Sequence, residues 1–97
     1  MAAYRAADAS VLILSNQGHG VPDLLVAHAH VSGRRSFLVE VKDGSKPPSA
    51  RRLTPDERRW ADAWHGEYWV VETVADALRS LEGPAQMREE INGTFEF

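Results

Sequence analysis

Three polar side chains in the first half of the chain could act together in chemistry: Asp23, Glu40 and Lys42. The carboxylate oxygens of Asp23 and Glu40, with the main-chain carbonyl of Val41 beside them, are hard ligands that suit Mg²⁺ or Mn²⁺. A lysine next to such an ion can orient or deprotonate a water molecule, or offset negative charge on a phosphate. These residue types therefore indicate phosphodiester hydrolysis, provided that the fold brings them together.

Two short strands must position these side chains. Residues 22–30 and 36–42 are rich in branched apolar residues, and Ser32 with Gly33 between them forms a tight-turn signal. Pro22 stands at the first position of its strand, where a missing N–H group is tolerated. We therefore expect a β-hairpin that turns at Ser32 and Gly33.

The register of this hairpin decides which side chains share a face. A turn at that point places Asp23 opposite Lys42 and Leu25 opposite Glu40. Because side chains alternate along a strand and opposed residues share a face, Asp23, Glu40 and Lys42 all lie on one face. A slip of one residue would move Asp23 to the other face. That other face is apolar and comprises Leu24, Val26, Phe37, Val39 and Val41.

The remaining elements complete one small domain. Thr54 and Glu57 form a capping box, with Pro55 at the first helical position, so a helix begins there. The other expected elements are at most a short helix within residues 1–9, a strand at 10–15, a strand at 68–72 and a helix from 73 that ends at Gly83. The order predicts an α/β fold with a mixed four-stranded sheet, in β-β-β-α-β order, flanked by helices.

Length and composition agree with a single domain over residues 1–97, with a core at about 10–82 and a tail at 84–97. The chain has 97 residues, 43% hydrophobic and 26% charged, and a formal net charge of -3. It has no cysteine, which excludes disulfides and thiolate metal sites. We see no signal peptide and no apolar run long enough to span a bilayer, so we expect a soluble, intracellular protein.

A basic segment follows the hairpin. Residues 43–52 contain glycine and two prolines, so we expect an exposed loop. We expect the nucleic-acid backbone to be held by the cations in and near this loop and by one loop histidine, namely Lys46, Arg51, Arg52, Arg58 and His19. Plain solvated charges remain an alternative for Arg51 and Arg52, and a solvated loop histidine for His19.

Two further assignments have alternatives. Glu57 is either a capping residue alone or an auxiliary ligand of the metal site. The tryptophans Trp60, Trp64 and Trp69 lie where a helix and a strand must pack, so we expect them in the core, with base stacking as the alternative.

The motifs resemble those of a known nuclease superfamily. Gly20-Val-Pro-Asp23, followed by Glu40-Val-Lys42 at the end of the next strand, resembles the PD-(D/E)XK motif. Leu53-Thr-Pro-Asp-Glu57 before an aromatic helix, and then YWVVETVADAL, are similar to the VRR-NUC branch, which includes small nucleases of phages and bacteria. The resemblance covers residues 10–82.

This resemblance implies a restriction-endonuclease-like core and a Mg²⁺- or Mn²⁺-dependent endonuclease. Asp23, Glu40 and Lys42 would be catalytic, and Asp23, Glu40 and Val41 would bind the metal. The substrate would be DNA, chosen by structure, such as the branched DNA of Holliday junctions. The protein would be a homodimer in the cytoplasm of a bacterium or a phage-infected cell. The alternatives are a catalytically impaired DNA-binding module and a protein-interaction domain.

The chain departs from the family pattern at two places. Family members usually carry a glutamate on an N-terminal helix that completes the metal site, whereas residues 1–9 contain no glutamate and only Asp8. Many relatives also have glutamine where this chain has Glu57. The first departure motivates the alternative of a nuclease fold that binds DNA without cutting it.

Overall fold

The computed structural model describes residues 2–30 and 33–83, and its elements follow the predicted order. A short helix and three strands come first, α1 (Ala2–Ala6), β1 (Ser10–Ile13), β2 (Leu24–His30) and β3 (Gly33–Val41). Two helices, a strand and a helix follow, α2 (Pro48–Arg51), α3 (Pro55–Ala63), β4 (Tyr68–Val71) and α4 (Val74–Glu82). The four strands form one sheet in the order β1-β2-β3-β4, with β4 parallel to β3 and the other neighbours antiparallel. The predicted α/β fold with a mixed four-stranded sheet is confirmed.

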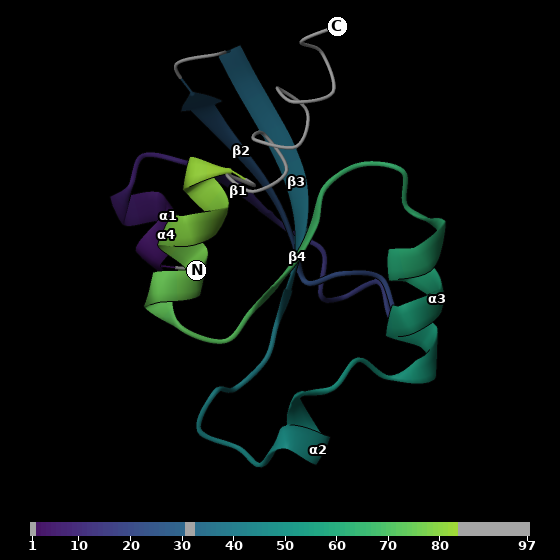
Figure 1. Ribbon diagram of the computed structural model, residues 1–97. Helices are drawn as coiled ribbons and strands as arrows, with labels where there is room; N and C mark the ends of the chain where they lie inside the picture. The colour runs from purple at the N-terminus through teal and green to yellow at the C-terminus, as the bar shows by residue number, and fades with distance from the viewer. Residues whose placement is uncertain (1, 31–32, 84–97) are drawn as a thin grey trace, which may run out of the picture.

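Helices cover the two faces of the sheet differently. Figure 1 shows α1 and α4 together on one side of the strands, α3 on the other side, and α2 beyond the end of β3. Parallel β3 and β4 need a crossover connection, and this connection carries α2 and α3 away from the face that α1 and α4 cover. Among the described elements, one face of the sheet is therefore covered by α1 and α4, and the other face is approached only by α3.

The buried core lies between the sheet and the pair α1 and α4. Its fully buried side chains include Tyr4 of α1 and Phe37 of β3, whose rings meet edge to face with centroids 6.2 Å apart. The Tyr4 hydroxyl and the Ser80 hydroxyl of α4 form a buried hydrogen bond of 2.8 Å. These contacts connect the first helix to the last one across the apolar face that the sequence predicts.

The register of the hairpin differs from the predicted one. Leu24 pairs with Val39 and His30 with Gly33, so the predicted pairing of Asp23 with Lys42 is wrong. When this pairing is extended by one residue beyond Leu24 and Val39, Asp23 lies opposite Glu40 rather than Lys42. The offset is two residues, and because side chains alternate with a period of two, the shared face of Asp23, Glu40 and Lys42 is retained.

Two local expectations are wrong. The segment expected as a loop at 43–52 contains α2, because Pro48 can occupy the first helical turn without losing a needed N–H group. Trp60 and Trp64 do not join the buried core, since α3 contains no buried residue and Trp64 is exposed. Trp69, by contrast, packs against the core as expected.

One strand is shorter than predicted, and one helix begins where it was predicted. The strand expected at 10–15 ends at Ile13, while the Thr54–Glu57 capping box begins α3 as predicted. Within residues 2–30 and 33–83, no helix is long and apolar enough to cross a membrane. The tail at 84–97 and the turn residue Ser32 lie outside the described residues.

Candidate active site

Asp23 stands at the point where the chain enters β2. Its Oδ2 accepts a hydrogen bond of 2.8 Å from the main-chain N–H of Val41, which lies on β3 two residues beyond the last pair of the β2–β3 ladder. The side chain thus takes the place of the next ladder hydrogen bond and fixes the carboxylate against the end of β3. The same carboxylate lies close enough to Glu40 to interact with its side chain.

Glu40 is the buried member of the cluster. It is 4% exposed, and its Oε1 atom is buried without a hydrogen-bond partner among the described residues. Burial raises the pKa of Glu40 to about 8, and the nearby carboxylates of Asp23 and Glu57 raise it in the same direction. A carboxylate buried beside another carboxylate is costly unless a proton or a cation offsets the charge.

Lys42 lies between two carboxylates. Its Nζ atom donates to Glu57 Oε1 at 2.7 Å and is 3.9 Å from Glu40 Oε2. The Lys42 side chain is 13% exposed and that of Glu57 is 16% exposed, so both charges are largely shielded from water. The three predicted residues Asp23, Glu40 and Lys42 therefore come together on one face of the sheet.

Glu57 has two tasks at once. Its Oε1 accepts from the Thr54 main-chain N–H at 2.8 Å, which completes the capping box, and also from Lys42. Burial alone would raise the pKa of Glu57, but the hydrogen bonds from Lys42 and Thr54 outweigh it, so the pKa lies below its usual value. The cap of α3 is therefore also the group that orients Lys42.

Tyr68 is a site residue that the sequence did not single out. It begins β4, and its hydroxyl is buried without a hydrogen-bond partner in the described part of the chain. Burial raises the pKa of Tyr68 to about 12, with the charges of Glu40, Glu57 and Asp23 acting in the same direction. Two buried oxygens without partners, Glu40 Oε1 and the Tyr68 hydroxyl, thus occur in one cluster. From the sequence alone, Tyr68 at the start of an apolar strand could not be distinguished from a core residue.

The cluster offers few protein ligands for a metal ion. Among the residues that the structure describes, no group of three or more His, Asp or Glu side chains has the arrangement of a metal site. Asp23 and Glu40 supply two carboxylates, and the Val41 carbonyl is the third oxygen that the sequence suggests. Mg²⁺ typically keeps several waters and binds through one or two carboxylates plus substrate phosphate, so this donor set suits it.

The N-terminal helix brings no acid to this cluster. The sequence of α1 contains neither aspartate nor glutamate, and its Tyr4 is buried in the core on the opposite face of the sheet. Asp8 is exposed and follows α1 in a left-handed conformation, with φ of 65°. The carboxylates at the site come from β2, β3 and α3 instead.

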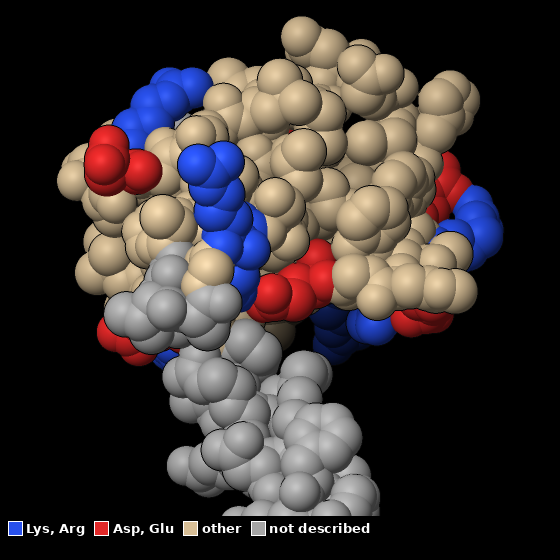
Figure 2. Space-filling model, turned by 90° about the horizontal axis from the view of Figure 1, so that it is seen from above, with Lys and Arg blue, Asp and Glu red and all other residues tan. Residues whose placement is uncertain are grey.

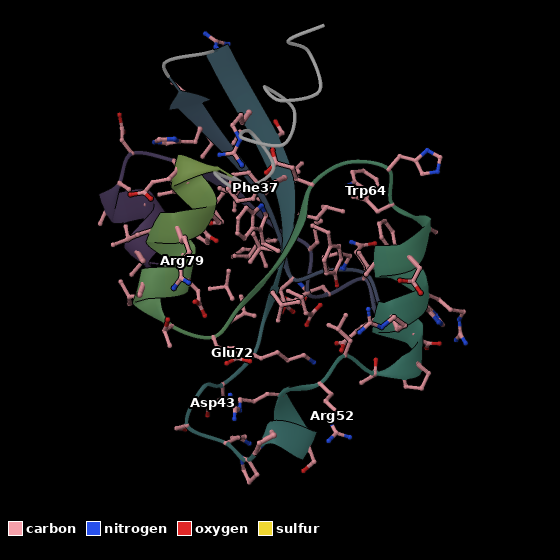
Figure 3. The ribbon with its side chains drawn as sticks, viewed as in Figure 1. Phe37, Asp43, Arg52, Trp64, Glu72 and Arg79 are labelled. Atoms are coloured by element: carbon pink, nitrogen blue, oxygen red, sulfur yellow. The ribbon has the colours of Figure 1, made fainter. Side chains whose placement is uncertain are left out.

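The basic residues expected to hold DNA are dispersed. Arg51 is paired with Glu72 at 3.0 Å, and the exposed Arg58 side chain lies 3.9 Å from Asp62. Lys46, Arg52 and His19 are exposed, and Figure 3 shows Arg52 beside α2, away from the sheet.

Positive charge is not concentrated on the face of the molecule seen in Figure 2. Lysine and arginine side chains appear there as separate groups, several of them beside acidic ones, among the described residues. Affinity for a phosphate backbone grows with the number of phosphates that a protein neutralises. This arrangement favours a few local phosphate contacts over a long electrostatic track.

Comparison with known proteins identifies no relative: no family model, no curated protein and no solved structure matches the chain.

Proposed function

We propose that the protein is a Mg²⁺- or Mn²⁺-dependent endonuclease that hydrolyses phosphodiester bonds of DNA at Asp23, Glu40 and Lys42. The observation that carries the proposal is the buried carboxylate of Glu40 beside a second carboxylate. Its Oε1 has no hydrogen-bond partner among the described residues, and its Oε2 is 3.9 Å from Lys42 Nζ. A divalent cation held by Asp23 and Glu40 would neutralise this excess of negative charge. The likeness to the PD-(D/E)XK motif supports the same assignment.

Each residue has a definite task in this proposal. Asp23 and Glu40 hold the cation, with Val41 contributing its main-chain oxygen. A bound ion of this kind polarises the phosphate and lowers the pKa of a water molecule. Lys42, fixed by its 2.7 Å hydrogen bond to Glu57, orients that water or offsets the charge that develops on the phosphate. The Tyr68 hydroxyl, which has no hydrogen-bond partner among the described residues, would donate to a molecule bound at the cluster.

The selectivity for branched DNA and the homodimer are proposals that rest on the resemblance. The face seen in Figure 2 carries its described lysine and arginine side chains as separate groups, and Arg51 and Arg58 lie beside acidic side chains; this supports recognition of local DNA structure through a few phosphate contacts. A second subunit could supply the further contacts that a branched substrate needs.

Cleavage of labelled branched and linear DNA, with Mg²⁺ or Mn²⁺, tests the proposal. We expect cleavage that requires the metal and prefers the branched substrate, and that is lost in the Asp23→Ala variant. The Asp62→Ala variant is the control, because this exposed aspartate lies outside the cluster. Equal cleavage by wild type and Asp23→Ala would contradict the assigned site.

A second candidate, a nuclease fold that binds DNA without cutting it, is favoured by the small number of carboxylate ligands. It predicts salt-dependent DNA binding but no cleavage with any divalent metal. The same assay, run beside a binding measurement at several salt concentrations, distinguishes the two.

A further inference from the structure

A hollow of about 380 Å³ lies between α3 and the loop that leads into β2. Pockets that hold small ligands in proteins are typically about 300–1,000 Å³, so this volume is sufficient for one planar ring system. Its walls are formed by His19 of the loop and by five residues of α3 and its end, namely Asp56, Arg59, Trp60, Ala63 and Trp64.

Two indole rings line this hollow. The rings of Trp60 and Trp64 lie with centroids 5.7 Å apart and planes inclined by 33°. Trp64 is 41% exposed, although tryptophan is highly buried on average in proteins. Figure 3 shows Trp64 at the end of α3, while Phe37 lies on the α4 side of the sheet. An exposed indole beside a second one in the wall of the same hollow offers apolar surface on which another molecule can stack.

The hollow adjoins the proposed active site. Trp60 lies three residues after Glu57, which places both on one face of α3, and Glu57 bonds directly to Lys42. On the loop side, a Cβ atom added to Gly20 would lie 2.4 Å from the main-chain carbon of Asp56. The loop is therefore pressed against the first turn of α3, three residues before Asp23.

Positively charged and hydrogen-bonding groups stand at the edge of the hollow. His19 is held there by a backbone in the left-handed region, with φ of 56°, between two glycines of the same conformation. The Arg59 side chain is 73% exposed, and it forms an ion pair with Asp56 that offsets the acidic charge. Such groups suit a phosphate or the polar edge of a base beside the stacked rings.

We infer that this hollow binds the base of an unpaired nucleotide, stacked on Trp60 and Trp64, beside the phosphodiester that the neighbouring site cleaves. The inference rests on the proposed function and names its substrate class: DNA with a single-stranded segment at the point of cleavage. Bases inside a duplex have both faces covered by their neighbours, so they cannot stack on a side chain unless they leave the helix. Aromatic side chains bind unpaired bases of any sequence in this way.

Binding of labelled oligothymidylate tests the inference, with EDTA present so that no cleavage occurs. We expect Trp64→Ala to weaken single-strand binding by about 5- to 150-fold, the usual effect of removing one stacking side chain. Leu78→Ala is the matched control, because it removes an apolar side chain of similar exposure, 47%, from α4 on the other face. It should leave binding unchanged.

Wild-type protein supplies a second test that does not depend on the folding of a variant. Oligothymidylate should quench the fluorescence of Trp60 and Trp64, and a strand of abasic sugars with the same phosphates should bind more weakly and quench little. Equal binding of the abasic and normal strands would overturn the inference. So would a change of oligomeric state in Trp64→Ala without any change in strand binding, because the hollow would then be a subunit contact.

The two proposals fail in different ways. Base-dependent binding without cleavage in Mg²⁺ or Mn²⁺ would contradict the proposed nuclease activity but support base binding in the hollow. Metal-dependent cleavage with no base-dependent binding would contradict base binding in the hollow but support the nuclease activity.

Discussion

Replacing Glu40 by glutamine should change how the stability of the metal-free protein depends on pH. Glu40 is buried beside other carboxylates, and its pKa is raised from 4.5 to about 8. The folded protein therefore holds the Glu40 proton more tightly than the unfolded chain. Stability from this group is fully present below pH 4.5 and is lost as the pH rises through about 8.

The size of the effect follows from the rise in pKa. A tenfold change in proton affinity is worth about 1.4 kcal/mol, so a rise from 4.5 to about 8 corresponds to about 5 kcal/mol. A domain of this size is stable by only about 5–15 kcal/mol in total. The loss on going from pH 4.5 to pH 8 is therefore a large share of the stability of the metal-free protein.

Denaturant unfolding in EDTA at a series of pH values measures this loss. We expect the free energies of unfolding of wild type and Glu40→Gln to be closest near pH 4.5 and the variant to be progressively more stable up to pH 8. Asp62→Asn serves as the control, because its side chain is 68% exposed and should leave the wild-type curve unchanged. Addition of Mn²⁺ at pH 8 should stabilise wild type and not Glu40→Gln.

Parallel curves for wild type and Glu40→Gln would refute this reasoning. They would mean that Glu40 has the same pKa in the folded protein as in the unfolded chain. Its negative charge would then not destabilise the fold, and a bound cation would have no such destabilisation to offset.

Three further predictions concern residues around the cluster. Lys42→Ala should lower the rate of DNA cleavage by about 10²- to 10⁴-fold. Lys46→Ala, which removes an exposed cation, should change the rate only slightly. Similar losses of rate for the two variants in a cleavage assay would argue against a catalytic Lys42. Tyr68→Phe should slow cleavage. It should also raise the free energy of unfolding by about 1 kcal/mol, because it removes a buried hydroxyl that has no hydrogen-bond partner in the described part of the chain; a loss of stability in urea would show that the hydroxyl is bonded within the protein. Gly20→Ala should destabilise the protein more than Gly18→Ala and should also weaken Mn²⁺ binding. Both glycines have positive φ, but only a Cβ atom at Gly20 would meet the backbone of α3. Equal effects of the two substitutions in calorimetry would contradict the packing described for this loop.

The fold was predictable because its signals are local. The capping box at Thr54 and the glycine after α4 have short-range physical causes, and the structure confirms the helices they delimit. The antiparallel pairing of the two hairpin strands is confirmed as well. The shared face of Asp23, Glu40 and Lys42 was also predictable, because alternation survives an error of two residues in register. The register itself was not, since it depends on where the turn lies, and Gly33, which was expected in the turn, pairs with His30 inside the ladder.

Features that depend on the tertiary arrangement could not be predicted. The capping glutamate Glu57 reaches Lys42 only because α3 lies over that face of the sheet. Tyr68 joins the cluster through the parallel pairing of β3 and β4, in which it lies beside Leu38. Trp60 and Trp64 have the spacing of a buried helix face, but α3 covers the sheet too loosely to bury them.

The proposed active site requires that Asp23 and Glu40 share one divalent cation. Calorimetric titration of Mn²⁺ into the protein, compared with its Asp23→Asn variant, tests this directly. We expect one Mn²⁺ per chain for wild type and a large loss of affinity in the variant, with Asp62→Asn behaving as wild type. Absence of Mn²⁺ binding, or equal affinity in wild type and Asp23→Asn, would contradict it.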